Sequence, residues 1–496
     1  MKTIFDVAII GGGINGCGCA ADAALRGLKV ALIEQGDLAS QTSSKSTKLI
    51  HGGLRYLEQL ELGLVKKALN ERENLLKLAP HLVHPQSFVL PHQKKSRPLW
   101  LLRVALFIYD HLSPTNSLPR SKLIRAKGNT DYFKPLMKEM TKGCLFYDCA
   151  TCDVRLTIAN AIQAHEHGAS IMTHTTLVES AVIDNLWQLT LQPTTKPAFQ
   201  IQARAVINCT GPWVGEMSQL LSVPLVHEVS LVKGSHLLVH PLYTGDHAYL
   251  LQHDDQRVIF AIPYHGYTLV GTTEIAYSGS PKDVHIEPEE VAYLCSVINH
   301  YFNKQVNESQ IIATWSGLRT LVSDPHKSAH ALSRDYIYHF TQTPGPAVTV
   351  YGGKLTTYRQ LATEAIDRLH PIFPDLPDSI THLTPLPGAI LNGMDFTTYK
   401  TFAREKYHWL DSETLNHYLN HYGTRTEQLL AHKENIESLG ISFAEGFYQA
   451  EVDYLLTNEW AIHCEDILWR RTKLGLTTRE EGQRALSNYL LNKDRA

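Results

Sequence analysis

The pattern of apolar and polar residues predicts alternating strands and helices in the first part of the chain. Residues 4–10 form an apolar run that ends at glycines, and a segment of small residues with helical character follows. A second apolar run, 29–33, ends in Glu34. Between 64 and 78, apolar and charged residues recur at helical spacing. The order strand, turn, helix, strand is typical of an α/β domain.

Strand patterns return further along the chain. Residues 203–209 form an apolar run that meets the glycine turn 210–213, and residues 216–310 alternate in the manner of an antiparallel sheet. Several prolines between residues 371 and 387 separate a final segment. In that segment, residues 388–496, apolar residues show helical spacing and strand signals are few. We therefore expect an inserted sheet that acts as a substrate cap, and a helical domain in the last part of the chain.

The glycines of the first turn carry a specific signal. Gly11 permits the tight turn, Gly13 lets the backbone approach a pyrophosphate, and Gly16 with Ala20 lets the helix pack closely on the strand. The phosphates would then lie at the helix N-terminus. Glu34 offers acceptors to both hydroxyls of an adenine ribose and repels a 2′-phosphate, so the motif predicts FAD or NAD rather than NADP.

Composition limits the functional classes. With 496 residues, of which 44% are hydrophobic, the chain can bury the cores of two or three domains. The formal net charge of -3 gives no reason to expect nucleic acid as a partner. We see no signal peptide and no apolar run of about 20 residues, so we expect no membrane span.

Eight cysteines are spread along the chain, and Cys149 and Cys152 form a close pair. No second pair completes a four-ligand zinc or iron-sulfur site, so we predict no metal. Buried free thiols in a reducing cytosol are the plainer interpretation, and a redox-active Cys-x-x-Cys stays open.

Residues 92–127 combine positive charge with an apolar centre. Their eight lysines and arginines accompany a single acid, Asp110, and flank the apolar run 99–109. This run is too short to span a bilayer, but it suits an anionic headgroup layer, where Trp100 and Tyr109 would favour the interface. We predict membrane docking by this segment. The alternative is a buried core helix with solvated basic flanks.

Several further motifs, taken together with the glycine turn, resemble those of one family. They are Ser43-Ser44 with His51-Gly52-Gly53-Leu54-Arg55-Tyr56, Lys233-Gly234-Ser235-His236, Trp315-Ser316-Gly317-Leu318-Arg319, Gly352-Gly353-Lys354-Leu355-Thr356-Thr357-Tyr358, and the terminal Glu459-Trp460 with Trp469-Arg470-Arg471-Thr472-Lys473. Over nearly its full length the chain is similar to FAD-dependent glycerol-3-phosphate dehydrogenases of the bacterial aerobic, respiratory type. Two positions depart from the family pattern: Thr320 stands where proline is frequent, and Glu274 where aspartate is common.

The resemblance implies an α/β fold. It consists of a Rossmann-like FAD-binding domain of the D-amino-acid-oxidase/glutathione-reductase type, an antiparallel β-sheet substrate cap and a C-terminal α-helical domain. The discontinuous FAD-binding domain would comprise residues 1–85, 148–215 and 311–372. The cap would comprise 86–147 and 216–310, with the docking segment 92–127, and the helical domain 388–496.

The resemblance also implies an activity. The enzyme would oxidise sn-glycerol 3-phosphate to dihydroxyacetone phosphate by hydride transfer to FAD, and the electrons would pass to membrane quinone. Because quinone is confined to the bilayer, the protein would be peripheral (monotopic) at the lipid surface, on the cytoplasmic face of the inner membrane. A homodimer is expected, and nucleic acid is not expected as a partner.

Hydride leaves a secondary alcohol only as the hydroxyl proton departs, so the site needs a base or a strong cationic field at that oxygen. Histidine titrates near working pH, and the matched motifs single out His236 and His51. We favour His236 as the base and place His51 beside the flavin, although either histidine could take the proton. The motifs place Arg319 nearest the reacting carbon, where it would stabilise negative charge on oxygen. Lys354 would either stabilise negative charge on the reduced flavin or help to bind the phosphate.

The substrate phosphate carries close to two negative charges, which a planar guanidinium can bind through two oxygens at once. Arg334 is predicted to bind the phosphate, with Arg55 and Tyr56 as further substrate-binding residues. Arg55 could serve either at the phosphate or beside the reacting carbon. The residues predicted to bind the cofactor are Gly11, Gly13, Asn15, Gly16, Glu34, Ser43, Ser44, Lys48, His51, Gly52, Thr210, Gly211, Gly353, Lys354, Leu355 and Thr356.

Other functions stay open at this point. A glycerol-3-phosphate oxidase on the same fold would pass electrons to oxygen and release hydrogen peroxide. A non-catalytic flavin or phosphometabolite sensor would keep the binding residues without turnover. An amino acid or another 2-hydroxy compound could be the substrate, although several arginines favour a phosphate. A multisubunit anaerobic dehydrogenase is disfavoured, because it would need a cysteine-rich region and the last segment holds only Cys464.

Overall fold

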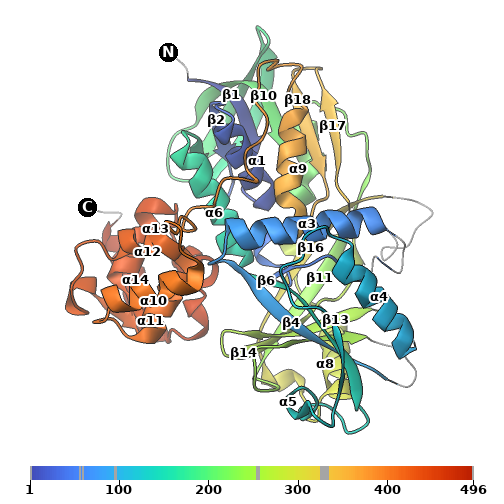
Figure 1. Ribbon diagram of the computed structural model, residues 1–496. Coiled ribbons are helices and arrows are strands. Elements are labelled where there is room, and N and C mark those ends of the chain that lie inside the picture. Colours follow the sequence, from blue (N-terminus) through green and yellow to red (C-terminus); the bar gives the residue numbers. More distant parts are fainter. Residues whose placement is uncertain are drawn as a thin grey trace.

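A computed structural model describes residues 3–54, 57, 61–93, 98–252, 257–323 and 335–493. Its first sheet has eight strands (Figure 1). The parallel part runs in the order β18 (Ala347–Tyr351), β10 (Phe199–Asn208), β1 (Ile4–Ile10), β2 (Val30–Ile33) and β7 (Ser170–Met172). The antiparallel strands are β17 (Ile337–Thr341), β8 (Thr175–Ile183) and β9 (Leu186–Pro193).

Helices cover one face of this sheet. They are α1 (Ile14–Leu25), α6 (Asp153–Glu166) and α9 (Tyr358–Asp367), and their apolar residues pack on Val7 and Ile9 of β1. Small residues in α1 permit this close packing, since a Cβ at Gly18 would lie 2.9 Å from the ring of Tyr358. The other face packs on the β8–β9 hairpin and on α7 (Val214–Leu220).

The second sheet has ten strands and adjoins the first (Figure 1). They are β3 (Leu49–Ile50), β4 (Val83–Pro91), β5 (Lys122–Arg125), β6 (Lys142–Thr151), β11 (Val229–Val239), β12 (Ala248–Gln252), β13 (Val258–Tyr264), β14 (Tyr267–Gly271), β15 (Ile275–Tyr277) and β16 (Ile311–Val322). Only β4 and β12 pair in parallel among the described strands of this sheet. Two helices, α8 (Pro288–Tyr301) and α5 (Thr130–Phe133), contribute to the same apolar core.

One strand lies elsewhere than its predicted domain suggests. The sequence groups residues 311–372 with the FAD-binding domain, whereas β16 pairs with β11 of the second sheet from Ile311 to Val322. The long register with β11 continues the antiparallel sheet, and a local residue pattern cannot show which sheet a strand joins. The domain boundaries themselves stay predictions.

Two helices border the second sheet in different ways. α3 (Leu62–Leu78) crosses the molecule between the two sheets, and α4 (Leu99–His111) lies at the outer edge (Figure 1). α4 buries Leu102, Leu106 and Tyr109. Its opposite side, which we term the apolar face of α4, exposes Trp100, Leu101, Val104, Phe107 and Ile108. Within the described ranges, no helix has the length and hydropathy needed to cross a membrane.

The C-terminal helices form a cluster of their own, on the opposite side of the molecule from α4 (Figure 1). They are α10 (Phe396–Lys406), α11 (Ser412–Tyr422), α12 (Thr426–Leu429), α13 (Gln449–Asn458) and α14 (Glu480–Lys493), with a hairpin of β19 (Ser442–Ala444) and β20 (Phe447–Tyr448) and a π-helical segment, Asp466–Arg471. Their helical character agrees with the spacing of residues 388–496. A buried ion pair between Arg155 of α6 and Glu459 joins this cluster to the first sheet.

Candidate functional site

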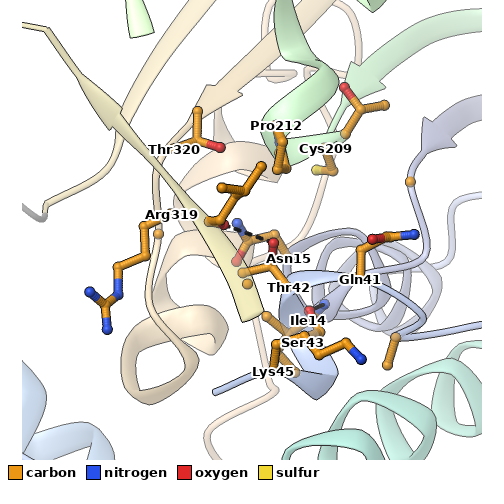
Figure 2. Close-up of a pocket in the computed structure, with 18 of the residues that line it drawn as sticks. Ile14, Asn15, Gln41, Thr42, Ser43, Lys45, Cys209, Pro212, Arg319 and Thr320 are labelled. Atoms are coloured by element: carbon orange, nitrogen blue, oxygen red, sulfur yellow. Dashed lines mark hydrogen bonds between the residues drawn. The ribbon is translucent and has the colours of Figure 1, made fainter. Parts of the chain in front are cut away.

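A cavity of about 570 Å³ opens where the two sheets meet the first glycine turn. Its walls come from the β1–α1 turn, residues 39–52, the β10–α7 turn, β16 and residues 352–356. Figure 2 shows side chains from these separate segments gathered around it. The cavity therefore unites the sequence motifs that lie hundreds of residues apart.

The glycine turn has the geometry that close approach to a ligand requires. Gly11 has a φ of +110°, and a Cβ there would lie 2.7 Å from the carbonyl oxygen of Cys209. A Cβ at Gly16 would lie 1.8 Å from the carbonyl oxygen of Gly11, so Gly16 holds the turn without lining the cavity. α1 begins immediately after the turn and directs its N-terminal dipole toward this space. An anionic pyrophosphate fits such a helix end.

Asn15 supports the fit of a large cofactor. Its Nδ2 donates to the carbonyl oxygen of Gly352 at 3.1 Å, which joins the first turn to the second glycine turn. Asn15 lines the cavity, and its buried Oδ1 has no hydrogen-bond partner among the described residues. Gly353, with a φ of +115°, leaves no room for a side chain because a Cβ would lie 2.7 Å from Asn15 Nδ2. The turns fit together around the space that FAD would occupy.

Glu34 stands at the end of β2, as the sequence predicts. Its Oε2 accepts the N–H of Gly12 at 2.6 Å, and its Oε1 accepts the N–H of Gly36 at 2.7 Å. Burial raises the pKa of Glu34, and the two backbone hydrogen bonds oppose that shift. The carboxylate lines the cavity and is placed to accept a ribose hydroxyl.

His236 lies on β11, only 1% exposed, with its ring stacked near Trp315. Its Nε2 lies 3.0 Å from Thr47 Oγ1, and its Nδ1 has no partner among the described residues. Burial, with the charges of Lys48 and Arg319, lowers the pKa of His236 to about 3. The imidazole is therefore neutral near pH 7 and has a nitrogen able to accept a proton.

Arg319 lies on β16 and lines the same cavity as His236. Its Nη1 lies 3.3 Å from Glu274 Oε1, and its side chain is 30% exposed. Figure 2 shows this side chain extending from the strand on the side away from Ile14 and Ser43. The guanidinium thus adds fixed positive charge to the open part of the site.

Lys48, a predicted cofactor-binding residue, lies behind the cavity wall and forms a buried ion pair there. Its Nζ donates to both carboxylate oxygens of Asp153 at 2.9 Å and to the carbonyl oxygen of Ser44 at 3.0 Å, and neither Lys48 nor Ser44 lines the cavity. Burial alone would raise the pKa of Asp153, but Lys48 and the hydrogen bonds lower it by more, so the net shift of this pKa is downward. The ion pair fixes the segment that carries Thr47.

Two other segments complete the wall. Ser43 Oγ accepts the N–H of Ile14 at 2.9 Å (Figure 2), which ties the segment after β2 to the first turn of α1. The backbone N–H of His51 donates to Thr356 Oγ1 at 3.3 Å, so the segment after β3 contacts the segment after β18. These contacts place His51 beside Lys354 and Leu355 in the lining.

The structure brings most of the predicted site residues together. Those that line the cavity are Gly11, Gly13, Asn15, Glu34, Ser43, His51, Gly52, Thr210, Gly211, His236, Arg319, Gly353, Lys354, Leu355 and Thr356. The substrate-binding predictions Arg55, Tyr56 and Arg334 lie outside the described residues. The assigned roles stay proposals.

Sequence reasoning missed Thr47 and Asp153. Thr47 lies next to Lys48 inside a polar run, which offered no reason to prefer it over its neighbours. Asp153 begins α6 and meets Lys48 only in the folded chain, 105 residues away. A buried lysine needs a compensating acid, but the sequence does not say which acid supplies it.

The fold and the cavity define a flavin oxidoreductase. Residues 6–359 match the family described as FAD dependent oxidoreductase, and residues 379–490 match the C-terminal domain of alpha-glycerophosphate oxidase. The chain belongs to the FAD-dependent glycerol-3-phosphate dehydrogenase family, and FAD is its cofactor. The expected fold class and the resemblance are thus confirmed.

Similar proteins extend over the whole chain. The glycerol-3-phosphate dehydrogenase of Pseudomonas aeruginosa is 44% identical over 497 residues, which cover 99% of this chain and 96% of the relative. The D-erythritol 1-phosphate dehydrogenase of Brucella abortus is 42% identical over 491 residues, 98% of each chain. The structure of glycerol-3-phosphate dehydrogenase from Bacillus halodurans, complexed with FAD, matches with a TM-score of 0.77 at 24% identity, covering 99% of this chain and 94% of that one.

Proposed function

We propose that this enzyme oxidises sn-glycerol 3-phosphate to dihydroxyacetone phosphate and passes the electrons to membrane quinone. The observation that carries the proposal is the meeting of the glycine turn, His236 and Arg319 in one cavity. FAD, when bound, would supply the acceptor for the hydride of the substrate carbon. Gly11, Gly13, Asn15 and Glu34, with the other predicted lining residues, would hold it.

His236 takes the hydroxyl proton in this proposal. Burial keeps the imidazole neutral, and the positive charges of Lys48 and Arg319 lower its basicity in the free site. A phosphate with nearly two negative charges would offset those charges when it binds. Substrate binding is therefore expected to raise the pKa of His236 by the part that these two charges contribute, while the effect of burial, the larger cause, stays.

Arg319 stabilises the oxygen from which the proton departs. Its guanidinium keeps its charge at any working pH, and Glu274 at 3.3 Å orients it from one side. The phosphate itself is assigned to Arg334 with Arg55 and Tyr56, on the basis of the motifs alone. Lys354, in the wall with His51, would face the negative charge of the reduced cofactor.

The apolar face of α4 supports delivery of electrons to the bilayer. Trp100 is 68% exposed and Phe107 is 62% exposed, and lysines and arginines flank this helix in the sequence. Such a surface suits the headgroup layer of an anionic membrane. Peripheral attachment at the inner membrane and a homodimer are parts of the same proposal.

Anaerobic stopped-flow absorbance tests the proposal. The FAD-loaded protein is mixed with glycerol 3-phosphate, and a short-chain quinone or oxygen is then added. We expect rapid flavin bleaching that quinone reverses. Reversal mainly by oxygen would instead indicate an oxidase, and no bleaching would indicate a different substrate or a sensor.

D-Erythritol 1-phosphate is a second candidate substrate. The Brucella abortus relative named for it is nearly as similar to this chain as the Pseudomonas aeruginosa glycerol-3-phosphate dehydrogenase. Both compounds pair a phosphate with an oxidisable secondary alcohol, so the same cationic site suits either. We expect kcat/KM to be higher for glycerol 3-phosphate, and the reverse ranking would reassign the substrate.

A further inference from the structure

The loop that follows β2 forms part of the cofactor wall. Glu34 binds the N–H groups of Gly12 and Gly36, and the N–H of Ala39 donates to the carbonyl oxygen of Gly12 at 3.0 Å. Glu34, Gln35, Ala39 and Ser40 line the cavity. The loop and the glycine turn therefore form one hydrogen-bonded unit, and a displacement of the loop would move the turn.

Asp37, within this loop, is bound by the C-terminal helical cluster. Arg471 donates to both of its carboxylate oxygens, at 2.5 Å and 2.7 Å, and Arg470 Nε donates to Asp37 Oδ2 at 2.5 Å. Asp37 is 2% exposed, and the Arg471 side chain is fully buried. These contacts join residues more than 430 positions apart in the sequence.

The two arginines are held in place by their own segment. Arg471 Nη2 donates to the carbonyl oxygen of Glu459 at 2.7 Å, and Arg470 Nη2 donates to Asp466 Oδ1 at 2.5 Å. Asp466 Oδ2 in turn accepts the backbone N–H groups of residues 462 and 463. Both guanidinium groups are thus preorganised for Asp37, which limits the entropy lost when the contact forms.

A metal ion does not explain this cluster. Asp37, His174 and Asp466 have ligand atoms within 4.8 Å of one another. However, guanidinium groups already bind both carboxylates. The arginines supply the positive charge that a cation would bring, so the cluster lacks the excess negative charge that a divalent ion needs.

We infer that Arg470 and Arg471 are positioning residues for FAD, by which the C-terminal helical cluster holds the loop of residues 34–40 in the shape that receives the adenosine end of the cofactor. Loss of Arg471 would leave Asp37 buried beside a single guanidinium group. Such a carboxylate turns toward water, and the loop that carries Glu34 must follow. The inference rests on the cofactor assignment and is independent of which substrate the enzyme oxidises.

Equilibrium titration of the FAD-free protein with FAD, followed by flavin fluorescence, tests the inference. We expect Arg471→Gln to raise the Kd for FAD at least tenfold, and Arg471→Lys to recover part of the loss because it restores one charge. Arg470→Gln, at a site that is 11% exposed and more tolerant of change, should raise the Kd at least threefold. Unchanged affinity in Arg471→Gln and Arg470→Gln would overturn the inference.

Arg425→Gln is the matched control. Arg425 also lies in the C-terminal cluster and forms an ion pair with Glu166 of α6, but among the described residues it forms no hydrogen bond or ion pair with the loop of residues 34–40. We expect its FAD affinity to stay within twofold of the wild-type value. An equal loss in this variant would mean that any weakening of the cluster releases FAD, and the specific role of the two arginines would be rejected. Thermal melts of the FAD-free variants check that each is folded.

Discussion

Burial and neighbouring charges fix the charge state of individual residues in and around the cavity. His236 is held neutral because the surrounding chain removes its hydration, whereas Asp153 is held ionised beside Lys48. Removal of one member of such a buried pair leaves the other charge uncompensated and costs about 3–5 kcal/mol. Substitutions of Lys48 or Asp153 would therefore lower the stability of the fold, which would obscure any effect on the reaction rate. Arg319 is partly exposed, so its substitution tests catalysis more directly.

Arg319→Ala is expected to slow flavin reduction by about 100-fold, because it removes the charge that stabilises the developing oxyanion. Binding of the substrate should weaken much less, since the phosphate is assigned to other residues. Single-turnover stopped-flow at several substrate concentrations separates the rate from the affinity. Arg484→Ala, at an exposed surface ion pair on α14, serves as the control and should behave as wild type. A normal reduction rate in Arg319→Ala would exclude the assigned role.

At the scale of elements, α4 shows how one helix serves two environments. Its buried side reaches the site: Tyr109 Oη accepts the N–H of Gly52 at 2.8 Å and donates to Asp148 at 2.7 Å. Its other side presents the apolar face to the surroundings. The sequence offered docking and core packing as alternatives, and the helix has the features of both.

The double variant Trp100→Ser, Phe107→Ser is expected to bind anionic vesicles at least tenfold more weakly, because two large apolar side chains no longer enter the headgroup layer. Sedimentation with phosphatidylglycerol vesicles measures the bound fraction. Phe402→Ser removes an aromatic residue that is 44% exposed from α10 on the other side of the molecule, and the binding of this variant should match the wild type. If the double variant binds as well as Phe402→Ser does, the apolar face of α4 is not the docking surface.

At the scale of the whole molecule, the junction between the C-terminal cluster and the rest buries ionisable groups. His81, after α3, packs against Gly388, Gly423 and Phe396, and its pKa falls to about 3 through burial and the charge of Arg155. The unfolded chain takes up a proton at His81 below about pH 6.5, whereas the folded chain resists it until about pH 3. This histidine therefore costs stability as the pH falls through that window.

His81→Gln should make the protein less sensitive to acid. Between pH 6.5 and pH 4, the wild type should lose about 1.4 kcal/mol more stability per pH unit than the variant, since one proton fewer binds on unfolding of the variant. Thermal melts of both proteins across this range give the two slopes. Parallel slopes would show that His81 titrates normally in the folded chain.

Local motifs predicted the first strand, the glycine turn, the helix after it and the position of Glu34 at the end of the second strand, because neighbouring residues decide these features. β1 has the expected bounds, and α3 begins two residues before the predicted helix. The glycines could be assigned from sequence since their role depends on backbone conformation and close approach. Most of the predicted site residues also line the cavity, because each belonged to a motif with a known arrangement.

The sequence by itself determined the cofactor class, the kinds of element and the motifs that supply the site. Only the tertiary structure decided which distant groups meet: β16 with β11, Thr47 with His236, Asp153 with Lys48, and Asp37 with the two arginines. Patterns of apolar residues and turns act over a few positions, so they are visible in a linear sequence. A buried ion pair or hydrogen bond forms between whichever segments the packed chain brings together, and its partners are fixed by that packing alone.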